Sequence, residues 1–203
     1  MTRSRRNTYG GGARTNVTGL EFEFGTDLKT SMEAAGFKIE VFNLNDGKQV
    51  SPMAYQVYRG GVLVGYIISQ LRLYDYLNFL ARSEDSGWTM KLSKKLKPDE
   101  AFFNVQTNSL HIIEKKAQSG TGSVDEKLQT FPFKIRQYKR LVEGLSVNGE
   151  SITVHYVYCL DKFFQKNEYK DLFDYMNEHG MTYFIQDAEG SLKLPLSLIG
   201  LEE

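Results

Sequence analysis

The chain has 203 residues, and its 25 Lys and Arg are balanced by 25 Asp and Glu, so the formal net charge is zero and gives no sign of an acidic partner. A composition of 41% hydrophobic and 25% charged residues with 4 Pro is that of a globular protein and excludes a disordered or fibrous chain. Cys159 is the only cysteine and there are three histidines, so neither an internal disulfide nor a Cys/His zinc site is expected. We expect a protein of the reducing cytoplasm.

The N-terminal segment is basic and rich in glycine, without a hydrophobic period. We predict a flexible basic arm over 1–15 and a single domain over 16–203. The basic start runs into Tyr9 and three glycines rather than an apolar stretch, which argues against a secretion signal. The longest apolar run, 62–68, falls far short of the roughly 20 residues that a membrane-spanning helix requires, so no membrane partner is expected.

Hydrophobic spacing predicts the elements of the first half of the chain. Apolar residues recur at intervals of three and four over 18–35, which is typical of an amphipathic helix, and Gly36 ends it. Gly60 and Gly61 supply the positive φ that a tight turn needs, so a hairpin is expected around them. The other expected elements are a strand over 37–42, a turn at 45–47, hairpin strands over 54–58 and 62–68, and a helix over 71–80 before a polar loop at 83–87.

The second half alternates strands with helices. Ser123 and Glu126 have the spacing of a capping box at the start of a helix over 124–141. The other expected elements are short strands over 101–105 and 110–116 joined by a turn at 106–109, a buried strand over 151–158, a helix over 168–179 closed by Gly180, and a strand over 182–185. This order predicts an α/β (α+β) domain with a central mixed β-sheet flanked by helices.

The neutral total conceals blocks of charge. Residues 1–20 carry +4 and residues 91–140 carry +6, whereas residues 21–90 carry −3 and residues 141–203 carry −7. Such blocks can give a protein one basic face and one acidic face, which suits a polyanion bound in one orientation. The alternative is that the blocks are an accident of the sequence.

Acidic and basic side chains meet around the two short strands. Asp99 opens the first strand. Glu114 and Lys116 are two residues apart on the second strand, so the side chains of these two residues point to the same face. If the strands pair as a hairpin, Asp99 and Glu114 meet at one end and offer hard oxygen ligands to Mg²⁺. Lys116 is then within reach of a metal-bound water, which suits phosphodiester hydrolysis. Strand alternation sends Glu100 and Lys115 to the opposite side, where Lys115 is expected to be solvated or bound to phosphate. Ordinary solvated turn chemistry is the alternative.

Taken in order, these fragments resemble a nuclease signature. Pro98-Asp99 and Glu114-Lys115-Lys116, with hydrophobic and turn-forming residues between them, resemble the two halves of the motif of the PD-(D/E)XK nucleases, the restriction-endonuclease-like superfamily. Gly19-Leu20-Glu21-Phe22-Glu23 is similar to a pattern on the first helix of many of these enzymes. The segment 122–128 is similar to the one that follows the catalytic strand in a subset of restriction enzymes. The resemblance extends over roughly residues 16–160.

This resemblance implies a restriction-endonuclease-like core and a Mg²⁺-dependent endonuclease, with Mn²⁺ as a substitute ion. It implies that Asp99, Glu114 and the backbone carbonyl of Lys115 hold the metal, that Lys116 positions the attacking water, and that Glu23 is a third acidic residue near the metal. By analogy with type II restriction enzymes, it further implies sequence-specific cleavage of double-stranded DNA to 5′-phosphate and 3′-hydroxyl ends, a homodimer, a prokaryotic cytoplasm and a cognate DNA methyltransferase.

Other basic or polar side chains are candidates for contact with the DNA backbone. A flexible basic arm gains counterion-release energy without a fixed fold, and relatives place the helix after the catalytic strand near phosphates. A solvated helix face accounts for the same charges. The candidates are Arg3, Arg5, Arg6, Arg14, Lys94, Lys95, Gln118, Lys127, Lys134 and Arg136. Two alternative functions remain open: a structure-specific or repair nuclease of the same fold, and a non-catalytic DNA-binding module.

Overall fold

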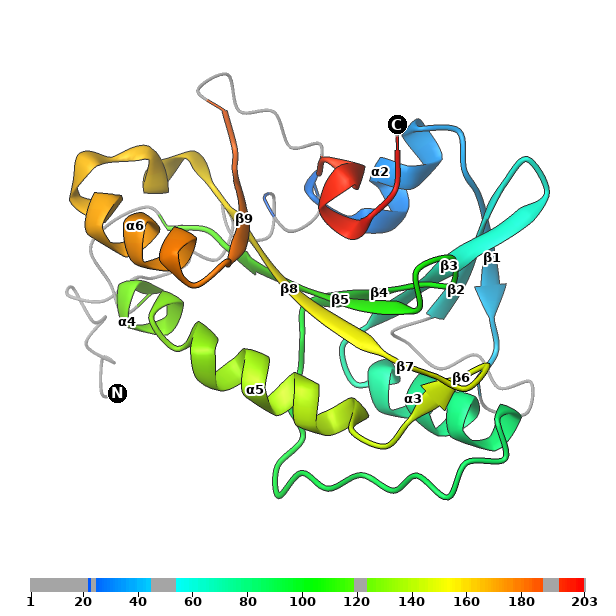
Figure 1. Cartoon of the computed structure of the whole chain (residues 1–203). Coiled ribbons are helices and arrows are strands. Elements are labelled where there is room, and N and C mark those ends of the chain that lie inside the picture. Colours follow the sequence, from blue (N-terminus) through cyan, green and yellow to red (C-terminus); the bar gives the residue numbers. More distant parts are fainter. Residues whose placement is uncertain (1–21, 23–24, 45–53, 119–123, 188–193, 203) are drawn as a thin grey trace, which may run out of the picture.

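The computed structural model describes residues 22, 25–44, 54–118, 124–187 and 194–202. Its centre is a seven-stranded sheet with the strand order β1-β2-β3-β4-β5-β8-β9 (Figure 1). The strands are β1 (Lys38–Phe42), β2 (Ala54–Arg59), β3 (Val62–Ser69), β4 (Glu100–Asn104), β5 (Ser109–Lys116), β8 (Thr153–Leu160) and β9 (Thr182–Ile185). Strands β1 to β5 pair antiparallel with their neighbours, whereas β5 pairs parallel with β8 and β8 with β9, so the sheet is mixed.

Helices cover both faces of this sheet, which confirms the predicted fold class (Figure 1). Buried residues of α3, α5 and α6 pack with one face, and those of α2 and η3 pack with the other. The helical elements are α2 (Leu28–Ala34), α3 (Arg72–Ser83), α4 (Val124–Leu128), α5 (Phe131–Val142) and α6 (Lys170–Glu178), with short 3-10 turns η1 (Lys162–Gln165), η2 (Asn167–Tyr169) and η3 (Leu196–Ile199). A separate two-stranded ribbon pairs β6 (Ser146–Val147) with β7 (Glu150–Ser151). No helix in the described part of the chain is long and apolar enough to cross a membrane.

Side chains of the central strands alternate between two hydrophobic cores. On β5, Leu110 and Ile112 belong to the core beneath α3 and α5, whereas Ile113 belongs to the core beneath α2. Because the side-chain period of a strand is two, Glu114 and Lys116 continue the α5 side and Lys115 continues the α2 side. The two cores therefore decide which charged groups at the end of β5 face one another.

Glycine shapes two places in the sheet. Gly60 and Gly61 have φ values of 58° and 81° at the turn between β2 and β3, as predicted for the hairpin. Gly65 lies inside β3, where an added Cβ would collide with the Phe102 ring and the Phe103 carbonyl of β4. Any other residue at Gly65 would push β3 away from β4, the strand that Asp99 precedes.

The predicted helix over 18–35 is wrong in its extent. Helix α2 spans Leu28–Ala34, and Asp27 caps it by accepting hydrogen bonds from the Thr30 backbone N–H and hydroxyl at 2.9 Å each. Asp27 has a ψ of 126°, which is not helical, so the chain turns there even though the apolar spacing continues. Of the segment before the cap, Phe22, Gly25 and Thr26 are described; Phe22 and Gly25 are helical and Thr26 lies in a turn. The predicted turn at 45–47 and Ser123 of the capping box lie outside the described residues.

Other element boundaries also differ from the prediction. The helix expected over 124–141 is two helices, α4 and α5, because Pro132 in the first turn of α5 has no N–H to continue the earlier helix. The helix expected over 168–179 begins as the 3-10 turn η2 and continues as α6, with Gly180 following it at a φ of 62°. The strand expected over 151–158 is β8, shifted by two residues, and β4 starts one residue early at Glu100.

Candidate active site

The end of the β4–β5 hairpin brings the motif residues together. The ladder between these strands runs from the Asn104–Ser109 pair to the Glu100–Ile113 pair. Beyond it, the Lys115 backbone N–H donates a 2.7 Å hydrogen bond to Asp99 Oδ2, which closes the hairpin end through a side chain. The predicted meeting of Asp99 with the end of β5 is therefore present in the structure.

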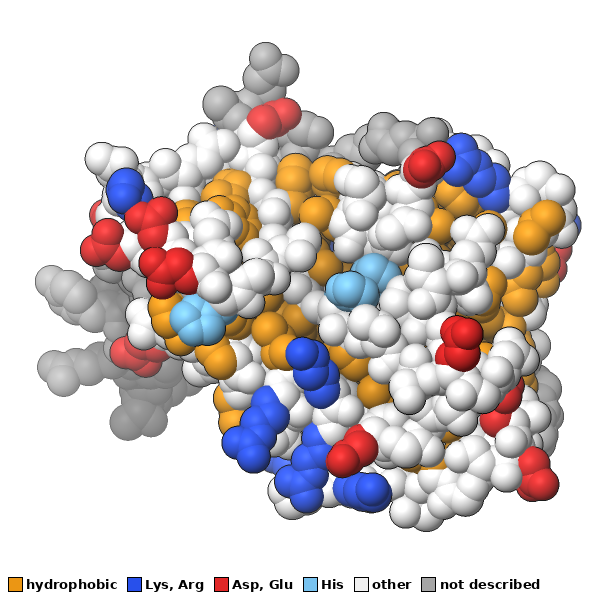
Figure 2. Space-filling model, viewed as in Figure 1, with side chains coloured by type: hydrophobic (Ala, Val, Ile, Leu, Met, Phe, Trp, Pro, Cys, Tyr) orange, Lys and Arg blue, Asp and Glu red, His pale blue; other side chains and the backbone are white. Residues whose placement is uncertain are grey.

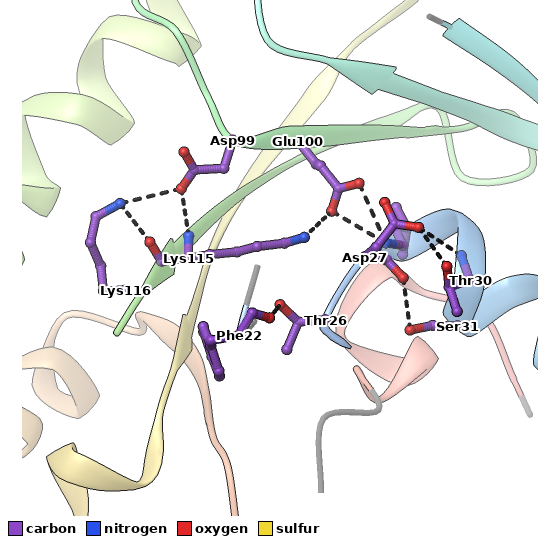
Figure 3. Close-up of polar contacts among 10 residues, drawn as sticks. Phe22, Thr26, Asp27, Thr30, Ser31, Asp99, Glu100, Lys115 and Lys116 are labelled. Carbon is purple, nitrogen blue, oxygen red and sulfur yellow. Dashed lines mark hydrogen bonds and ion pairs between the residues drawn. The ribbon is translucent and has the colours of Figure 1, made fainter. Parts of the chain in front are cut away.

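The ammonium group of Lys116 lies among three oxygen atoms. Its Nζ is 2.8 Å from the Lys115 carbonyl oxygen, 2.9 Å from Glu114 Oε2 and 3.3 Å from Asp99 Oδ2. Figure 3 shows that Lys116 and Lys115 leave β5 in opposite directions, the first toward Asp99 and the second toward Glu100. Two carboxylates and one carbonyl thus converge on a single positive charge.

These three oxygens are also the atoms expected to hold a metal. Mg²⁺ is usually held by one or two carboxylates, with water and substrate phosphate completing its coordination, and all of these ligands are hard oxygens. Among the described residues, no cluster contains three or more His, Cys, Asp or Glu, so the ion would depend on Asp99, Glu114 and the Lys115 carbonyl. Because the oxygens already surround a cationic group, their arrangement and chemistry fit a divalent cation.

Burial and charge act in opposite directions on Lys116. Its side chain is 18% exposed, so loss of solvent lowers the pKa of the ammonium, but Glu114 and Asp99 outweigh this and the pKa lies above its usual value. Lys116 is therefore protonated throughout the neutral range. An ammonium in this place can orient a water molecule or balance negative charge, but it cannot act as a general base at neutral pH.

On the opposite face, Lys115 forms a buried ion pair, so the expectation that its side chain is solvated or bound to phosphate is wrong. Its Nζ lies 2.6 Å from Glu100 Oε2, and the two side chains are 4% and 9% exposed. Helix α2 covers this side of the sheet, and the Leu28 backbone N–H donates to both Glu100 oxygens at 3.3 and 3.4 Å (Figure 3). The backbone of Lys115 therefore serves the site on one face while its side chain is anchored on the other.

Glu100 and Asp27 are coupled carboxyl groups at the start of α2. Burial, helped by the charge of Asp27 and a hydrogen bond with it, raises the pKa of Glu100 to about 7 against the opposing effect of Lys115. Burial also raises the pKa of Asp27, but hydrogen bonds from Thr30 and Glu100 more than offset this and hold it below its usual value. The pKa values of the two carboxyl groups are therefore displaced in opposite directions, that of Glu100 upward and that of Asp27 downward.

Helix α5 brings a second lysine to the site. Lys134 Nζ lies 3.5 Å from Glu114 Oε2, the same oxygen that Lys116 contacts. Tyr138, one turn further on, is buried, and burial together with the charge of Glu114 raises its pKa well above the usual value. The sequence marked Lys134 only as a phosphate contact. The buried positions Phe131 and Tyr138 on the same side of α5 are the signal that its side chain points inward.

The segment after Lys116 is fixed by Asp161, which follows β8. The Asp161 backbone N–H donates to the Lys116 carbonyl at 3.1 Å, and its Oδ2 accepts from the Gln118 backbone N–H at 3.0 Å. Gln118 is 7% exposed, so its side chain lies within the protein rather than on the surface.

The remaining predicted DNA contacts that the structure describes do not join this cluster. Lys94, Lys95, Lys127 and Arg136 are exposed, and Lys95 lies 4.9 Å from the centre of the Tyr74 ring. Of the predicted site residues, Glu23, Arg3, Arg5, Arg6 and Arg14 lie outside the described residues.

No protein-family model matches this chain, and no curated protein matches it significantly. Among solved structures, it is similar to an XisH family protein from Nostoc punctiforme, with 14% sequence identity and a TM-score of 0.33 over 84% of this chain and 93% of the other. A likeness at that level establishes neither a shared family nor a shared activity, so function has to be inferred from the residues of the site.

Proposed function

We propose that this protein is a Mg²⁺-dependent endonuclease that hydrolyses double-stranded DNA to 5′-phosphate and 3′-hydroxyl ends, in the manner of a type II restriction enzyme. The observation that carries the proposal is the convergence of Asp99, Glu114 and the Lys115 carbonyl on the Lys116 ammonium at the end of the β4–β5 hairpin. A mixed sheet flanked by helices that presents these residues is consistent with a restriction-endonuclease-like nuclease.

Each residue has a role that follows from its chemistry. Asp99, Glu114 and the Lys115 carbonyl would hold Mg²⁺, which when bound polarises the phosphate and lowers the pKa of a coordinated water. The Lys115 N–H orients the Asp99 carboxylate through its 2.7 Å hydrogen bond. Lys116, held protonated by Glu114 and Asp99, donates hydrogen bonds that orient the attacking water and offset negative charge on the phosphate.

The direct test is digestion of supercoiled plasmid and phage DNA in Mg²⁺, Mn²⁺ or Ca²⁺, followed by mapping of the ends. We expect discrete fragments with 5′-phosphates in Mg²⁺ and Mn²⁺, and DNA binding without cleavage in Ca²⁺. Asp99→Asn and Lys116→Met should abolish cutting. The matched controls Asp174→Asn and Lys170→Met, an exposed ion pair on α6, should leave it unchanged.

The outcomes also separate the neighbouring possibilities. A smear of DNA fragments, or cutting of branched DNA alone, would indicate a structure-specific or repair nuclease instead of a restriction enzyme. Absence of any cutting by the wild-type protein in either metal would leave a non-catalytic DNA-binding module.

A further inference from the structure

Lys134 approaches the candidate active site from an element outside the nuclease motif. It lies on α5, and its Nζ is 3.5 Å from Glu114 Oε2, which also accepts from Lys116 at 2.9 Å. The Lys134 side chain is 23% exposed, whereas Arg136 and Lys139 of the same helix are exposed. One carboxylate oxygen therefore has two ammonium groups beside it, from two different elements.

The packing of α5 fixes the direction of Lys134. Phe131 and Tyr138, three residues before and four residues after it, are each 1% exposed and lie on the same side of the helix. The Trp88 indole N–H donates a 3.2 Å hydrogen bond to the Leu141 carbonyl and holds the far end of α5. The backbone position of Lys134 therefore faces inward, and a rotation of α5 that turned it outward would expose two aromatic rings.

The charges of the cluster leave room for an anion once a metal is bound. Asp99 and Glu114 carry two negative charges, and Lys116 and Lys134 carry two positive charges, so the four groups balance. A divalent cation held by the two carboxylates makes the same cluster positive by two. With Glu114 holding a metal, the Lys134 ammonium would need another anionic oxygen within reach, which a phosphodiester supplies.

We infer that Lys134 is a further catalytic residue, whose ammonium contacts an oxygen of the scissile phosphate and stabilises the negative charge that develops there. The inference rests on the proposed function. In the hydrolysis, the water oxygen bonds to phosphorus and the P–O3′ bond breaks, with its electron pair remaining on O3′. One water proton reaches O3′ through solvent, which gives the 3′-hydroxyl and the 5′-phosphate. Lys134 transfers no proton in this step and acts by its charge.

Lys139 offers a matched control on the same helix. It lies on the other flank of α5, where it lines a hollow of about 480 Å³ together with His179 and Thr182. Figure 2 shows Lys and Arg side chains gathered over α5, and the exposed basic residues of that helix are Arg136, Lys139 and Arg140. Lys134→Met and Lys139→Met remove the same charge from the same helix, but only the first removes an ammonium beside Glu114.

The first measurement is single-turnover cleavage of plasmid DNA in Mg²⁺ with protein in saturating excess. We expect Lys134→Met to be about 10²-fold slower than the wild type, which is the usual loss for one charge-stabilising donor. Lys134→Arg should recover part of the rate, and Lys139→Met should retain it. The second measurement is the salt dependence of DNA affinity in Ca²⁺. In a plot of the logarithm of the binding constant against the logarithm of the salt concentration, Lys134→Met should have a slope smaller in magnitude by about 0.9, because one phosphate contact is lost.

Cleavage by Lys134→Met at the wild-type single-turnover rate overturns the inference, and so does an unchanged salt slope in Ca²⁺. If the wild-type protein cuts no DNA in Mg²⁺ or Mn²⁺, the proposed function fails and the catalytic role of Lys134 fails with it, whatever the slope. Thermal melting establishes that each variant is folded. If Lys134→Met does not fold, Lys134→Gln takes its place in both assays.

Discussion

Replacing Lys116 with methionine is expected to tighten metal binding while abolishing cleavage. The ammonium is 2.8, 2.9 and 3.3 Å from the three oxygens that would ligate Mg²⁺, so the protein's own cation and the metal compete for the same atoms. Methionine keeps most of the aliphatic length of the side chain but removes the charge. The two carboxylates then repel each other until a metal binds between them.

The size of this effect follows from the contacts that the metal must displace. A hydrogen bond to a charged group contributes about 1.5–3 kcal/mol net. Lys116 is 18% exposed and Asp99 is 35% exposed, so water replaces part of what is lost and the three contacts do not add fully. The equivalent of one such bond, about 1.5–3 kcal/mol, corresponds to an increase in metal affinity of about 10- to 150-fold.

The assay is calorimetric titration of Mn²⁺ or Mg²⁺ into the wild type and Lys116→Met without DNA. Because the pKa of Lys116 lies above its usual value, the gain in affinity should be the same at pH 6 and pH 8. Lys139→Met should bind metal like the wild type, and Asp99→Asn should bind it more weakly. A Lys116→Met variant that binds metal no more tightly than the wild type would refute the idea of competition for one set of oxygens.

Three further predictions concern the scaffold around the site. Glu100→Ala leaves the Lys115 ammonium buried without its carboxylate and should cost about 3–5 kcal/mol in the free energy of unfolding, measured in urea, with a smaller loss for Glu100→Gln. Because burial raises the pKa of Glu100 from 4.5 to about 7, its contribution to stability is fully present below about pH 4.5 and is lost as the pH rises to about 7. In urea unfolding, the free energy of unfolding of the wild type minus that of Glu100→Gln should fall between about pH 4.5 and pH 7 and stay constant above pH 7. If this difference does not change with pH, the raised pKa of Glu100 is contradicted. Gly65→Ala should lower the unfolding free energy by about 1–3 kcal/mol, because its Cβ would collide with the Phe102 ring and the Phe103 carbonyl. An unchanged melting temperature would show that β3 and β4 do not lie this close together.

Local patterns were sufficient to predict the hairpin and its charged end. The two-residue period of a strand determines that Glu114 and Lys116 share a face and that Lys115 does not, whatever the rest of the protein does. The turn at Gly60 and Gly61 was predictable for a similar reason, since glycine itself tolerates the positive φ that the turn requires. For the strand period and for this turn, the sequence and the structure agree.

Features that depend on distant contacts were not predictable in this way. Strand alternation placed Glu100 and Lys115 on the same face, but nothing near them in the sequence shows that α2 covers that face and buries the pair. The apolar spacing over 18–35 continues past the point where Asp27 caps α2, so the hydrophobic pattern concealed the break. Lys134 reaches Glu114 only because α5 packs against β8 at a particular rotation, which a helical period alone does not determine.

The most direct test of the central claim is the rate of plasmid cleavage in Mg²⁺ by the wild type, Glu114→Gln and the surface variant Glu33→Gln. Glu33 is an exposed carboxylate on α2 paired with Lys29, so its loss removes an equal charge away from the hairpin end. We predict discrete cutting by the wild type and Glu33→Gln, and none by Glu114→Gln. A folded Glu114→Gln variant that cuts DNA at the wild-type rate would show that the oxygens around Lys116 are not the catalytic centre.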